Sequence, residues 1–307
     1  MMPKIFAVVV TYQPDEALLS RLLQALAPQV SGGIVVNNGN SLTSMDKYLQ
    51  RTDFAVKHLQ SNTGVATALN AGFQWAEAQN ADFVITFDQD SEPAPDMVSC
   101  LLGAYQDLVA SGQKVGAVGP QQVDRRSGRC APFLAPISRQ RRRVTPDAGQ
   151  AVEVDHLITS GCMVPIPVWQ DVGSFLDDLF IDYVDIEWSL RMRHLGWHLF
   201  GVGGAMLTHS IGDKVAQWWA WQFPWHSPLR HYFIFRNGTY LQRLPHISLG
   251  WKLFDALQLA KKLVIFTLVG RPRSAHLRAM LCGICDGLGG RLGASSHPAA
   301  VAKPERN

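Results

Sequence analysis

The sequence predicts an α/β protein built on an open, mostly parallel sheet with flanking helices. The first observation is that short, unbroken apolar runs, typical of strands buried on both faces, alternate with longer segments of helical periodicity. The second is composition: the 307 residues are 47% hydrophobic and 17% charged, which excludes disordered, collagen-like and disulfide-scaffold proteins. This length accommodates one large α/β domain or two small ones.

The first part of the chain has the alternation of strand and helix that defines βαβ units. The expected elements are, in order, a strand at 5–10 (IFAVVV), a helix at 15–27, strands at 33–36 and 54–59, a helix that is opened by residues 61–64 and runs to 78, and a strand at 81–87.

The pattern changes beyond residue 124. Residues 125–150 are rich in Arg, Pro and Ser without clear periodicity, which indicates a long surface segment. The elements expected after it are short strands from 152, a helix near 186–194, a strand near 198–207, and amphipathic helices at 251–268 and 274–288. The predicted domains are accordingly 1–245, with halves 1–124 and 125–245, and a helical extension at 246–307.

Charge is unevenly distributed along the chain. Residues 1–224 hold 16 basic and 22 acidic side chains, whereas residues 225–307 hold 12 and 3. A basic, apolar C-terminal part predicts a face that meets phosphates or an anionic surface. The longest apolar stretch, 263–270, is shorter than the roughly 18–20 residues of a membrane-spanning helix, so a protein in the cytosol or on a membrane is expected.

The five cysteines are irregularly spaced. Cys282 and Cys285 form a C-x-x-C, but no further ligands lie at the spacing that a metal site needs. We expect them to be small apolar residues on a helix, in a reducing compartment.

Four polar clusters occur where ligands bind in such sheets, beyond the carboxyl ends of the strands. They are Thr11-Tyr12, Asn37-Asn38-Gly39, residues 61–64 and Asp88-Gln89-Asp90. Each cluster alone is typical of a turn. Four clusters on strands that should be adjacent predict a nucleotide pocket.

Asp88 and Asp90 are two carboxylates directly beyond a buried strand. Such close carboxylates repel each other unless a cation lies between them or one is protonated. Oxygen ligands favour Mg²⁺ or Mn²⁺, and His209, after a later strand, is a candidate third ligand. The alternative is that the acids cap the helical segment beginning near Pro93.

A second acidic constellation lies in LFIDYVDIEWSLR (179–191). Glu187 and Arg191 are four residues apart on a predicted helix, so we expect an ion pair. Asp185, near the start of that helix, is either a cap or a general base among apolar neighbours.

These segments together resemble the family 2 glycosyltransferases of the GT-A fold, and within them the bacterial rhamnosyltransferases that build O-antigen and related polysaccharides. The similarity extends over about residues 4–245 in collinear order. The segments that carry it are VVVTYQP (8–14), VVNNGN (35–40), SNTGVATALNAG (61–72), FDQDS (87–91), TSGCMVP (159–165), LFIDYVDIEWSLR (179–191) and THSIGD (208–213).

The resemblance implies a nucleotide-sugar site in the half 1–124. Thr11, Tyr12 and Asn38 match positions that line the nucleobase and ribose, and the loop and helix start beneath the nucleotide match Asn62, Gly64 and Asn70. The sequence departs from many relatives at Asn37-Asn38, where at least one acid is common.

The resemblance also implies the catalytic groups. Asp88 and Asp90 match the D-x-D motif, of which the last acid usually binds the metal, and His209 matches a histidine that joins the metal site in some members. Asp185 matches the catalytic base of inverting members, and Arg230, in HSPLRHYFIFRN (226–237), is placed to reach the diphosphate.

The implied reaction is inverting sugar transfer. Asp185 would accept a proton from an acceptor hydroxyl, while Mg²⁺ or Mn²⁺ would neutralise charge on the departing nucleoside diphosphate. The expected donor is dTDP-L-rhamnose, with a UDP-linked sugar as the alternative. A more distant alternative, a sugar-phosphate nucleotidyltransferase, would need a Gly-rich loop with Arg or Lys after the first strand, and residues 11–17 lack both features.

The implied acceptor is a saccharide, commonly linked to polyprenyl diphosphate, and no nucleic acid is expected. A cytoplasmic protein in peripheral contact with the inner face of the membrane would fit this acceptor. Lys252, Lys261 and Lys262 lie beside apolar residues in the helix 251–268, with Trp251 as a candidate interfacial anchor. The alternative is that these helices pack on the catalytic domain or on a second subunit of a homodimer.

Overall fold

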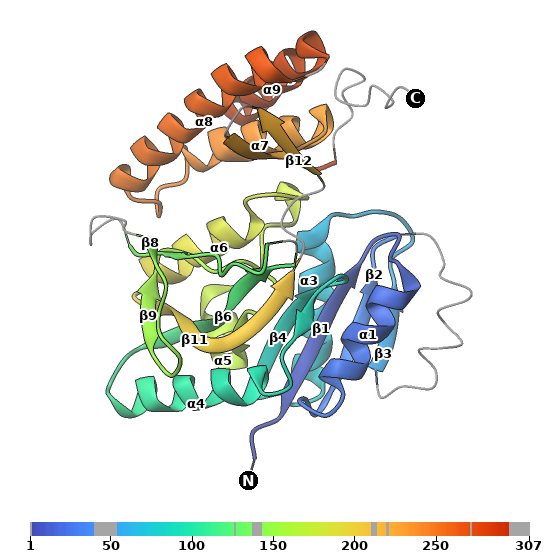
Figure 1. Cartoon of the computed structure of the whole chain (residues 1–307), viewed down its shortest axis with the longest axis vertical. Helices are drawn as coiled ribbons and strands as arrows, with labels where there is room; N and C mark the ends of the chain where they lie inside the picture. Colours follow the sequence, from blue (N-terminus) through green and yellow to red (C-terminus); the bar gives the residue numbers. More distant parts are fainter. Residues whose placement is uncertain are drawn as a thin grey trace.

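A computed structural model of the chain describes residues 2–39, 54–125, 127–136, 143–209, 214–218, 221–270 and 272–294, with the backbone alone at 209, 214–218 and 221–225. Its centre is a nine-stranded sheet of order β3-β2-β1-β4-β10-β6-β11-β5, in which β9 also pairs with β11 (Figure 1). The strands of this sheet are β1 Ile5–Thr11, β2 Gly32–Asn37, β3 Phe54–His58, β4 Phe83–Asp88, β5 Glu92–Pro93, β6 Val115–Asp124, β9 Ala151–Val154, β10 Met163–Pro165 and β11 His198–His209.

Two short pairs of antiparallel strands lie outside the main sheet. They are β7 Phe133–Leu134 with β8 Arg143–Val144, and β12 Lys214–Trp218 with β13 Trp221–Trp225. The first pair falls within the segment that was expected to be an irregular surface stretch.

Helices cover both faces of the sheet, as predicted. They are α1 Glu16–Leu26, α3 Val65–Ala78, α4 Met97–Ala110, α5 Ile166–Val172, the 3₁₀ turn η2 Asp177–Leu179, α6 Val184–His194, α7 Pro228–Leu241, α8 Leu249–Val269 and α9 Arg273–Gly289. Leucines of α1 and Met97 of α4 pack in one core with Ala7 and Val9, whereas Phe73 of α3 and Trp169 of α5 share the other core with Val8. Successive residues of β1 therefore serve opposite cores, which explains the continuous apolar run.

The strands at one end of the sheet are parallel, and their carboxyl ends lie together. Thr11 at the end of β1 is aligned with Asn37 at the end of β2, and Val10 is aligned with Asp88 at the end of β4. This register confirms the prediction that these polar strand ends are adjacent.

The other end of the sheet is mixed. β10 runs antiparallel between β4 and β6, while β6 and β11 are parallel. Sequence pattern does not indicate β6, because its segment VGAVGPQQVD contains glycine, proline and glutamine, which weaken a strand signal.

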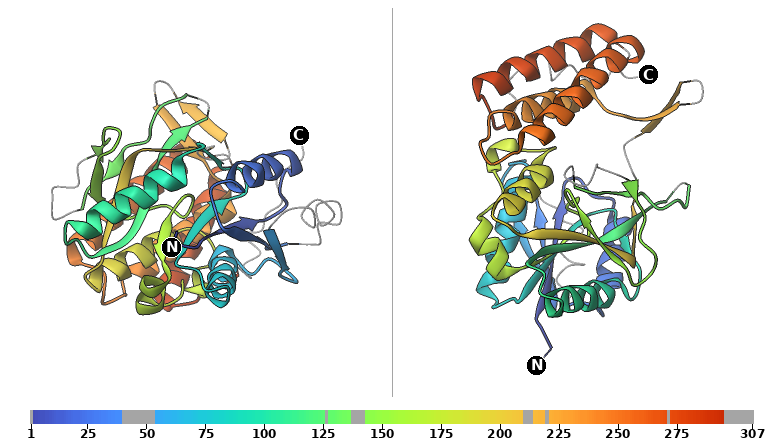
Figure 2. Two further views of the ribbon diagram at one scale, coloured as in Figure 1. Left: turned by 90° about the horizontal axis from the view of Figure 1, so that it is seen from below. Right: turned by 90° about the vertical axis from the view of Figure 1, so that its left-hand side faces the viewer.

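α7, α8 and α9 form a helical layer at the end of the molecule toward which β1 runs (Figures 1 and 2). The backbones of α7 and α9 approach closely because Gly283 has no side chain: a Cβ there would lie 2.5 Å from the carbonyl oxygen of Tyr232. Sequence pattern misses α7, since the helix is buried over most of its surface and has no clear amphipathic period.

α8 and α9, which form most of the described part of the predicted extension at 246–307, thus pack with α7, which precedes them. The boundary at residue 245 stays a prediction. In the part of the chain that is described, no helix is both long and apolar enough to cross a membrane. The five cysteines are free thiols, and Cys282 and Cys285 lie on α9 as expected.

Candidate active site

Three of the four polar strand-end clusters are joined by hydrogen bonds around Asn38. Its backbone N–H donates to the carbonyl of Thr11 at 2.7 Å, and its Oδ1 accepts from the N–H of Thr63 at 2.8 Å. Its Nδ2 donates to Oδ1 of Asn62 at 3.1 Å, which also accepts the N–H of Gly64 at 3.1 Å. The predicted residues Thr11, Asn38, Asn62 and Gly64 therefore form one polar network.

The fourth cluster joins this network through Tyr12. The side chain of Gln89, between Asp88 and Asp90, accepts the N–H of Tyr12 at 2.7 Å and donates to its carbonyl at 3.2 Å. Tyr12 is 47% exposed, and its ring lies against Gly39, where an added Cβ would be 3.3 Å from the ring. An exposed aromatic face at the strand ends can stack on a planar group.

Thr11 is fully buried, and its hydroxyl has no hydrogen-bond partner among the described residues. Leaving a buried hydroxyl unpaired costs about 1–3 kcal/mol. A polar ligand atom at this strand end would remove that cost.

Asp88 and Asp90 lie half-buried at the end of β4. Neither caps the following helix, because α4 begins at Met97 with Asp96 at its N-cap; that alternative is wrong. Arg125 holds the loop by donating to the carbonyl of Asp90 at 3.1 Å.

The donor set fits a hard divalent cation, since two carboxylates one residue apart supply oxygen ligands at an accessible strand end. His209, the predicted third ligand, ends β11, but its side chain lies outside the described residues. Within the described ranges, no three His, Cys, Asp or Glu side chains are grouped to hold a metal. The metal site stays a prediction.

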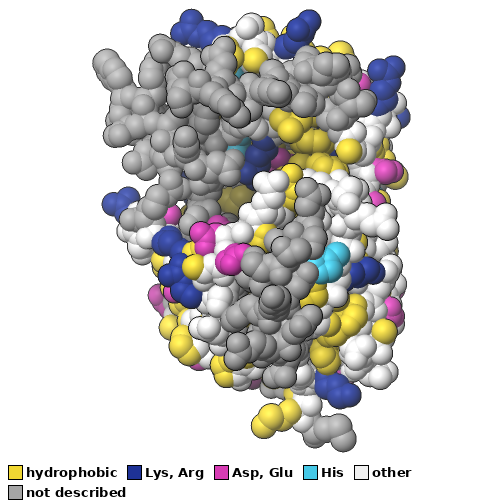
Figure 3. Space-filling view, turned by 90° about the vertical axis from the view of Figure 1, so that its right-hand side faces the viewer, with side chains coloured by type: hydrophobic (Ala, Val, Ile, Leu, Met, Phe, Trp, Pro, Cys, Tyr) yellow, Lys and Arg dark blue, Asp and Glu magenta, His cyan; other side chains and the backbone are white. Residues whose placement is uncertain are grey.

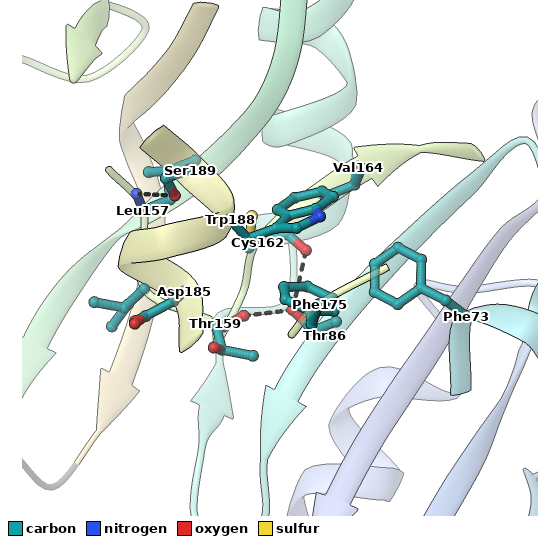
Figure 4. A pocket seen from close by; sticks show the side chains of 11 residues that line it. Phe73, Thr86, Leu157, Thr159, Cys162, Val164, Phe175, Asp185, Trp188 and Ser189 are labelled. Carbon is teal, nitrogen blue, oxygen red and sulfur yellow. Dashed lines mark hydrogen bonds between the residues drawn. The ribbon is translucent and has the colours of Figure 1, made fainter. Parts of the chain in front are cut away.

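Asp185 lies in the first turn of α6 and lines a small, mainly apolar pocket (Figure 4). Its Oδ1 accepts the N–H of Ile186 at 2.9 Å. Figure 4 places Asp185 near Thr159 at one end, with aromatic rings at the other. The other lining residues are Phe73, Thr86, Leu157, Ile158, Cys162, Val164, Phe175, Trp188 and Ser189.

This environment favours protonated acids. Burial raises the pKa of the Asp185 carboxyl, and the negative charge of Asp182 raises it further; His156 and the Ile186 amide oppose this. Burial also raises the pKa of the Cys162 thiol to about 12, with a contribution from Asp185, so the thiol stays neutral. A carboxylate with a raised pKa is suited to accept a proton from a hydroxyl.

The segment before α6 has an unusual backbone. Phe180, Asp182 and Tyr183 all have positive φ, at 64°, 60° and 64°, and none is glycine. Such conformations are costly and are retained where surrounding contacts impose them, often at functional sites.

Two buried residues of α7 hold this segment, and sequence reasoning did not identify them. Nδ2 of Asn237 donates to the carbonyls of Leu179, Ile181 and Asp182 at 2.9, 2.7 and 2.9 Å. Arg236 donates to the carbonyl of Leu179 at 2.9 Å. The available signal was an Arg-Asn pair inside the apolar run HYFIFRNGTYL, since buried polar side chains need partners.

Gly64 connects the strand-end polar network to the segment before Asp185. The N–H of Val65 donates to the carbonyl of Phe180 at 2.7 Å. Gly64 has φ +92°, and a Cβ there would lie 2.6 Å from that carbonyl oxygen. A glycine is needed for both reasons.

Arg230, predicted at a diphosphate, pairs with Asp182 at 3.3 Å. The partly exposed guanidinium of Arg230 therefore lies beside Asp182, which precedes Asp185 by three positions in the chain. Its diphosphate contact stays a prediction.

Asn70 is buried and uses its side chain within the protein. It exchanges hydrogen bonds with the backbone of Phe175 at 2.9 Å and donates to Asp177 at 2.8 Å. It therefore holds the start of the segment that leads to α6. The expected Glu187–Arg191 ion pair is present at 2.8 Å, with Glu187 fully buried.

Comparison with known proteins agrees with this geometry. Residues 6–157 match glycosyl transferase family 2. Over 305 residues the chain is 30% identical to the dTDP-rhamnosyl transferase RfbF of Shigella flexneri, a match that covers 97% of this chain and all of that relative.

Solved structures share the fold. TarS 1–349 of S. aureus, in complex with UDP-GlcNAc, has a TM-score of 0.58 at 14% identity and matches 92% of this chain and 81% of its own. GalNAc-T7 with UDP, GalNAc and Mn²⁺ has a TM-score of 0.56 at 15% identity over 83% of this chain. The match covers 54% of GalNAc-T7, so the chain spans about half the length of that protein. These likenesses confirm the GT-A fold.

Proposed function

Because the chain belongs to glycosyltransferase family 2, we propose that it transfers L-rhamnose from dTDP-L-rhamnose to a saccharide acceptor in bacterial surface polysaccharide synthesis. The donor is supported by the full-length similarity to a dTDP-rhamnosyl transferase. The chemistry is supported by one arrangement: the strand-end polar network is joined through Gly64 and Phe180 to the segment that carries Asp185.

The nucleotide is proposed to bind at the network of Thr11, Asn38, Asn62 and Gly64. The exposed ring of Tyr12 would stack on the nucleobase, and the buried hydroxyl of Thr11 would gain a partner. Asn70 would support the nucleotide site indirectly, because its side chain already donates hydrogen bonds to Phe175 and Asp177.

Asp88 and Asp90, with His209, are proposed to hold Mg²⁺ or Mn²⁺. When bound, the cation would neutralise charge on the leaving diphosphate. Arg230, beside Asp182, is proposed to contribute a further positive charge there.

Asp185 is proposed to be the catalytic base. Its carboxylate would take the proton of the acceptor hydroxyl, whose oxygen forms a bond to the anomeric carbon as the bond to the nucleoside diphosphate breaks with inversion. The partly buried position supports this role, because a carboxyl with a raised pKa accepts a proton more readily.

The test is a panel of nucleotide sugars with purified protein and Mg²⁺ or Mn²⁺, read by nucleotide release and by thermal stabilisation. We expect dTDP-rhamnose to stabilise the protein and to release dTDP when an acceptor is present, and chelation to abolish transfer. Asp185→Asn should retain donor stabilisation and lose about 10²-fold or more in kcat.

The matched control is Asp107→Asn, an exposed acid on α4, which should behave like the unaltered protein. Release from UDP-sugars alone would overturn the donor assignment. Near-normal turnover by Asp185→Asn would overturn the base.

A UDP-linked sugar is the second candidate donor. TarS and GalNAc-T7 are seen with UDP or UDP-GlcNAc, but they are at most 15% identical to this chain, against 30% for the dTDP-rhamnosyl transferase. The same panel distinguishes the two candidates.

The acceptor is proposed to be a polyprenyl-diphosphate-linked saccharide, which would place the enzyme on the inner face of the cytoplasmic membrane. The basic C-terminal part of the chain supports this placement.

A further inference from the structure

α8 has an exposed apolar stripe that no described part of the chain covers. Leu249, Leu253, Leu257, Val264 and Leu268 are 54–70% exposed. The opposite face of the helix is buried through Trp251, Asp255, Leu259 and Phe266. Trp251 is only 2% exposed, so the expectation that it anchors the protein at an interface is wrong. The exposed leucines occupy the outer face instead.

The charges that accompany this stripe have one sign. Lys252, Lys261, Arg273 and Arg278 are all at least partly exposed on α8 and α9. Lys262 lies on the inner side of α8, near Asp255 and Asp182, and does not belong to this set. With 3.6 residues per turn, Lys252 and Lys261 fall on opposite sides of the stripe. Figure 3 shows Lys and Arg side chains with hydrophobic ones between them along the upper edge of the molecule.

The acids of these two helices do not offset this charge at the surface. Asp255 and Asp286 are buried and accept hydrogen bonds from the hydroxyls of Tyr183 and Tyr232, each at 2.8 Å. The outer face of α8 and α9 is therefore apolar and positive.

We propose that the outer face of α8 docks on an anionic lipid bilayer. In a symmetric dimer, the outer face of α8 would pack against the same face of a second copy. The lysines of the two copies would then lie close together and repel each other. In an anionic bilayer, the leucines would instead insert among the acyl chains, and the lysines would contact the negatively charged headgroups.

Docking in this way would put the bilayer on the side of the active site. The helical layer lies at the end toward which β1 runs (Figure 1), and Tyr183, two residues before Asp185, bonds directly to Asp255 of α8. One helix, about 10–12 Å across, therefore separates the lipid surface from the segment that carries Asp185. An acceptor attached to a lipid would reach the site at this edge, a consequence that rests on the proposed function.

The test is co-sedimentation of the full chain with phosphatidylcholine vesicles, with and without phosphatidylglycerol, in the absence of any sugar donor. We expect binding to the anionic vesicles that weakens with salt. Leu253→Glu with Leu257→Glu should abolish it, and Lys252→Gln with Lys261→Gln should weaken it by roughly 25-fold, about fivefold for each lysine.

The control is Val109→Glu, which introduces a charge at an exposed apolar position on α4, at the other end of the molecule. It should bind vesicles normally, and all variants should keep the melting temperature and donor stabilisation of the unaltered chain. Because no donor is present, this result is independent of the transfer assay.

Two results would overturn the proposal. One is the absence of sedimentation with anionic vesicles at low salt. The other is a dimer in sedimentation velocity that Leu253→Glu dissociates, since the stripe would then be covered by a second copy.

Discussion

Asp185 combines a partly buried carboxyl group with a negatively charged neighbour, Asp182. Burial favours the neutral acid, and Asp182 adds to that effect, while His156 and the Ile186 amide reduce it. The carboxyl that is proposed to accept a proton is thus held at a pKa above its ordinary value. Its ionised form is correspondingly unfavourable in the folded protein.

This has an expected consequence for stability. An acid whose pKa is raised by folding stabilises the protein fully below its unfolded pKa of about 3.9, and that contribution is lost as the pH rises through the folded pKa. Asp185→Asn removes the charge and should raise the Tm at pH 7, with the gain disappearing toward pH 4.

The measurement is Tm against pH from 4 to 8, with Asp107→Asn as the control. The acid limb of kcat/KM, which reports the free enzyme, should lie above the range of an ordinary aspartate for the same reason. A Tm for Asp185→Asn that is unchanged or lower at every pH would contradict the prediction.

At the scale of elements, the connection from η2 to α6 is the strained part of the site. Three of the four residues 180–183 have positive φ, and none of them is glycine. Asn70 donates a hydrogen bond to Asp177 at the start of this connection. The N–H of Val65 donates to the carbonyl of Phe180, and the side chain of Asn237 donates to backbone carbonyls that include that of Asp182. The position of α6, and with it Asp185, depends on these contacts.

Gly64→Ala is expected to disturb this connection. Alanine would adopt an unfavourable positive φ and would meet the carbonyl of Phe180, so we expect a loss of about 1–3 kcal/mol in stability and at least tenfold weaker donor binding.

Gly103→Ala is the matched control. Gly103 lies inside α4 with open space at its Cβ, so alanine there should stabilise the protein by roughly 0.5–1 kcal/mol. Thermal unfolding and donor titration of both variants check the pair. Equal melting temperatures for the two variants would show that Gly64 is not under this constraint.

At the scale of the whole molecule, the helical layer supports the segment that leads to Asp185, the proposed catalytic base. Asn237 and Arg236 of α7 reach into the segment before α6, and Asp255 of α8 accepts a hydrogen bond from Tyr183. α7 in turn is packed closely against α9 through Gly283 and Gly287. The layer that presents the proposed lipid-facing stripe therefore also holds the residues beside Asp185.

Asn237→Ala should consequently impair catalysis more than donor binding. It removes three hydrogen bonds from a fully buried side chain to backbone carbonyls, at an expected cost of about 2–4 kcal/mol in stability. We expect kcat to fall more than tenfold while donor affinity changes less than twofold.

Gln242→Ala at the C-cap of the same helix is the control, since its amide bonds to Gly238 and Asp255 rather than to the backbone of that segment. A lower Tm with an unchanged kcat would mean that Asn237 has a structural role alone.

Much of this organisation could be predicted from sequence. The apolar runs of β1, β2 and β4 indicated buried parallel strands, and their polar ends were expected to be adjacent, as the register from Thr11 to Asn37 confirms. The ion pair between Glu187 and Arg191 was predicted because helical spacing alone brings these residues together.

Other features depend on contacts between distant parts of the chain. α7 was missed because a helix buried on most sides lacks an amphipathic pattern. The direction of Trp251 could not be read from its position in the sequence, because the packing of α8 against the rest of the protein determines which face is buried.

Local spacing and composition account for the α/β architecture, the polar strand ends, the acidic segment around Asp185 and the basic character of the C-terminal part. Packing between distant segments accounts for three other features. Asn237 and Arg236 hold the strained segment, Asp255 and Asp286 are buried, and leucines rather than Trp251 face outward on α8. Each of these depends on which distant surfaces pack together, and local sequence patterns do not contain that information.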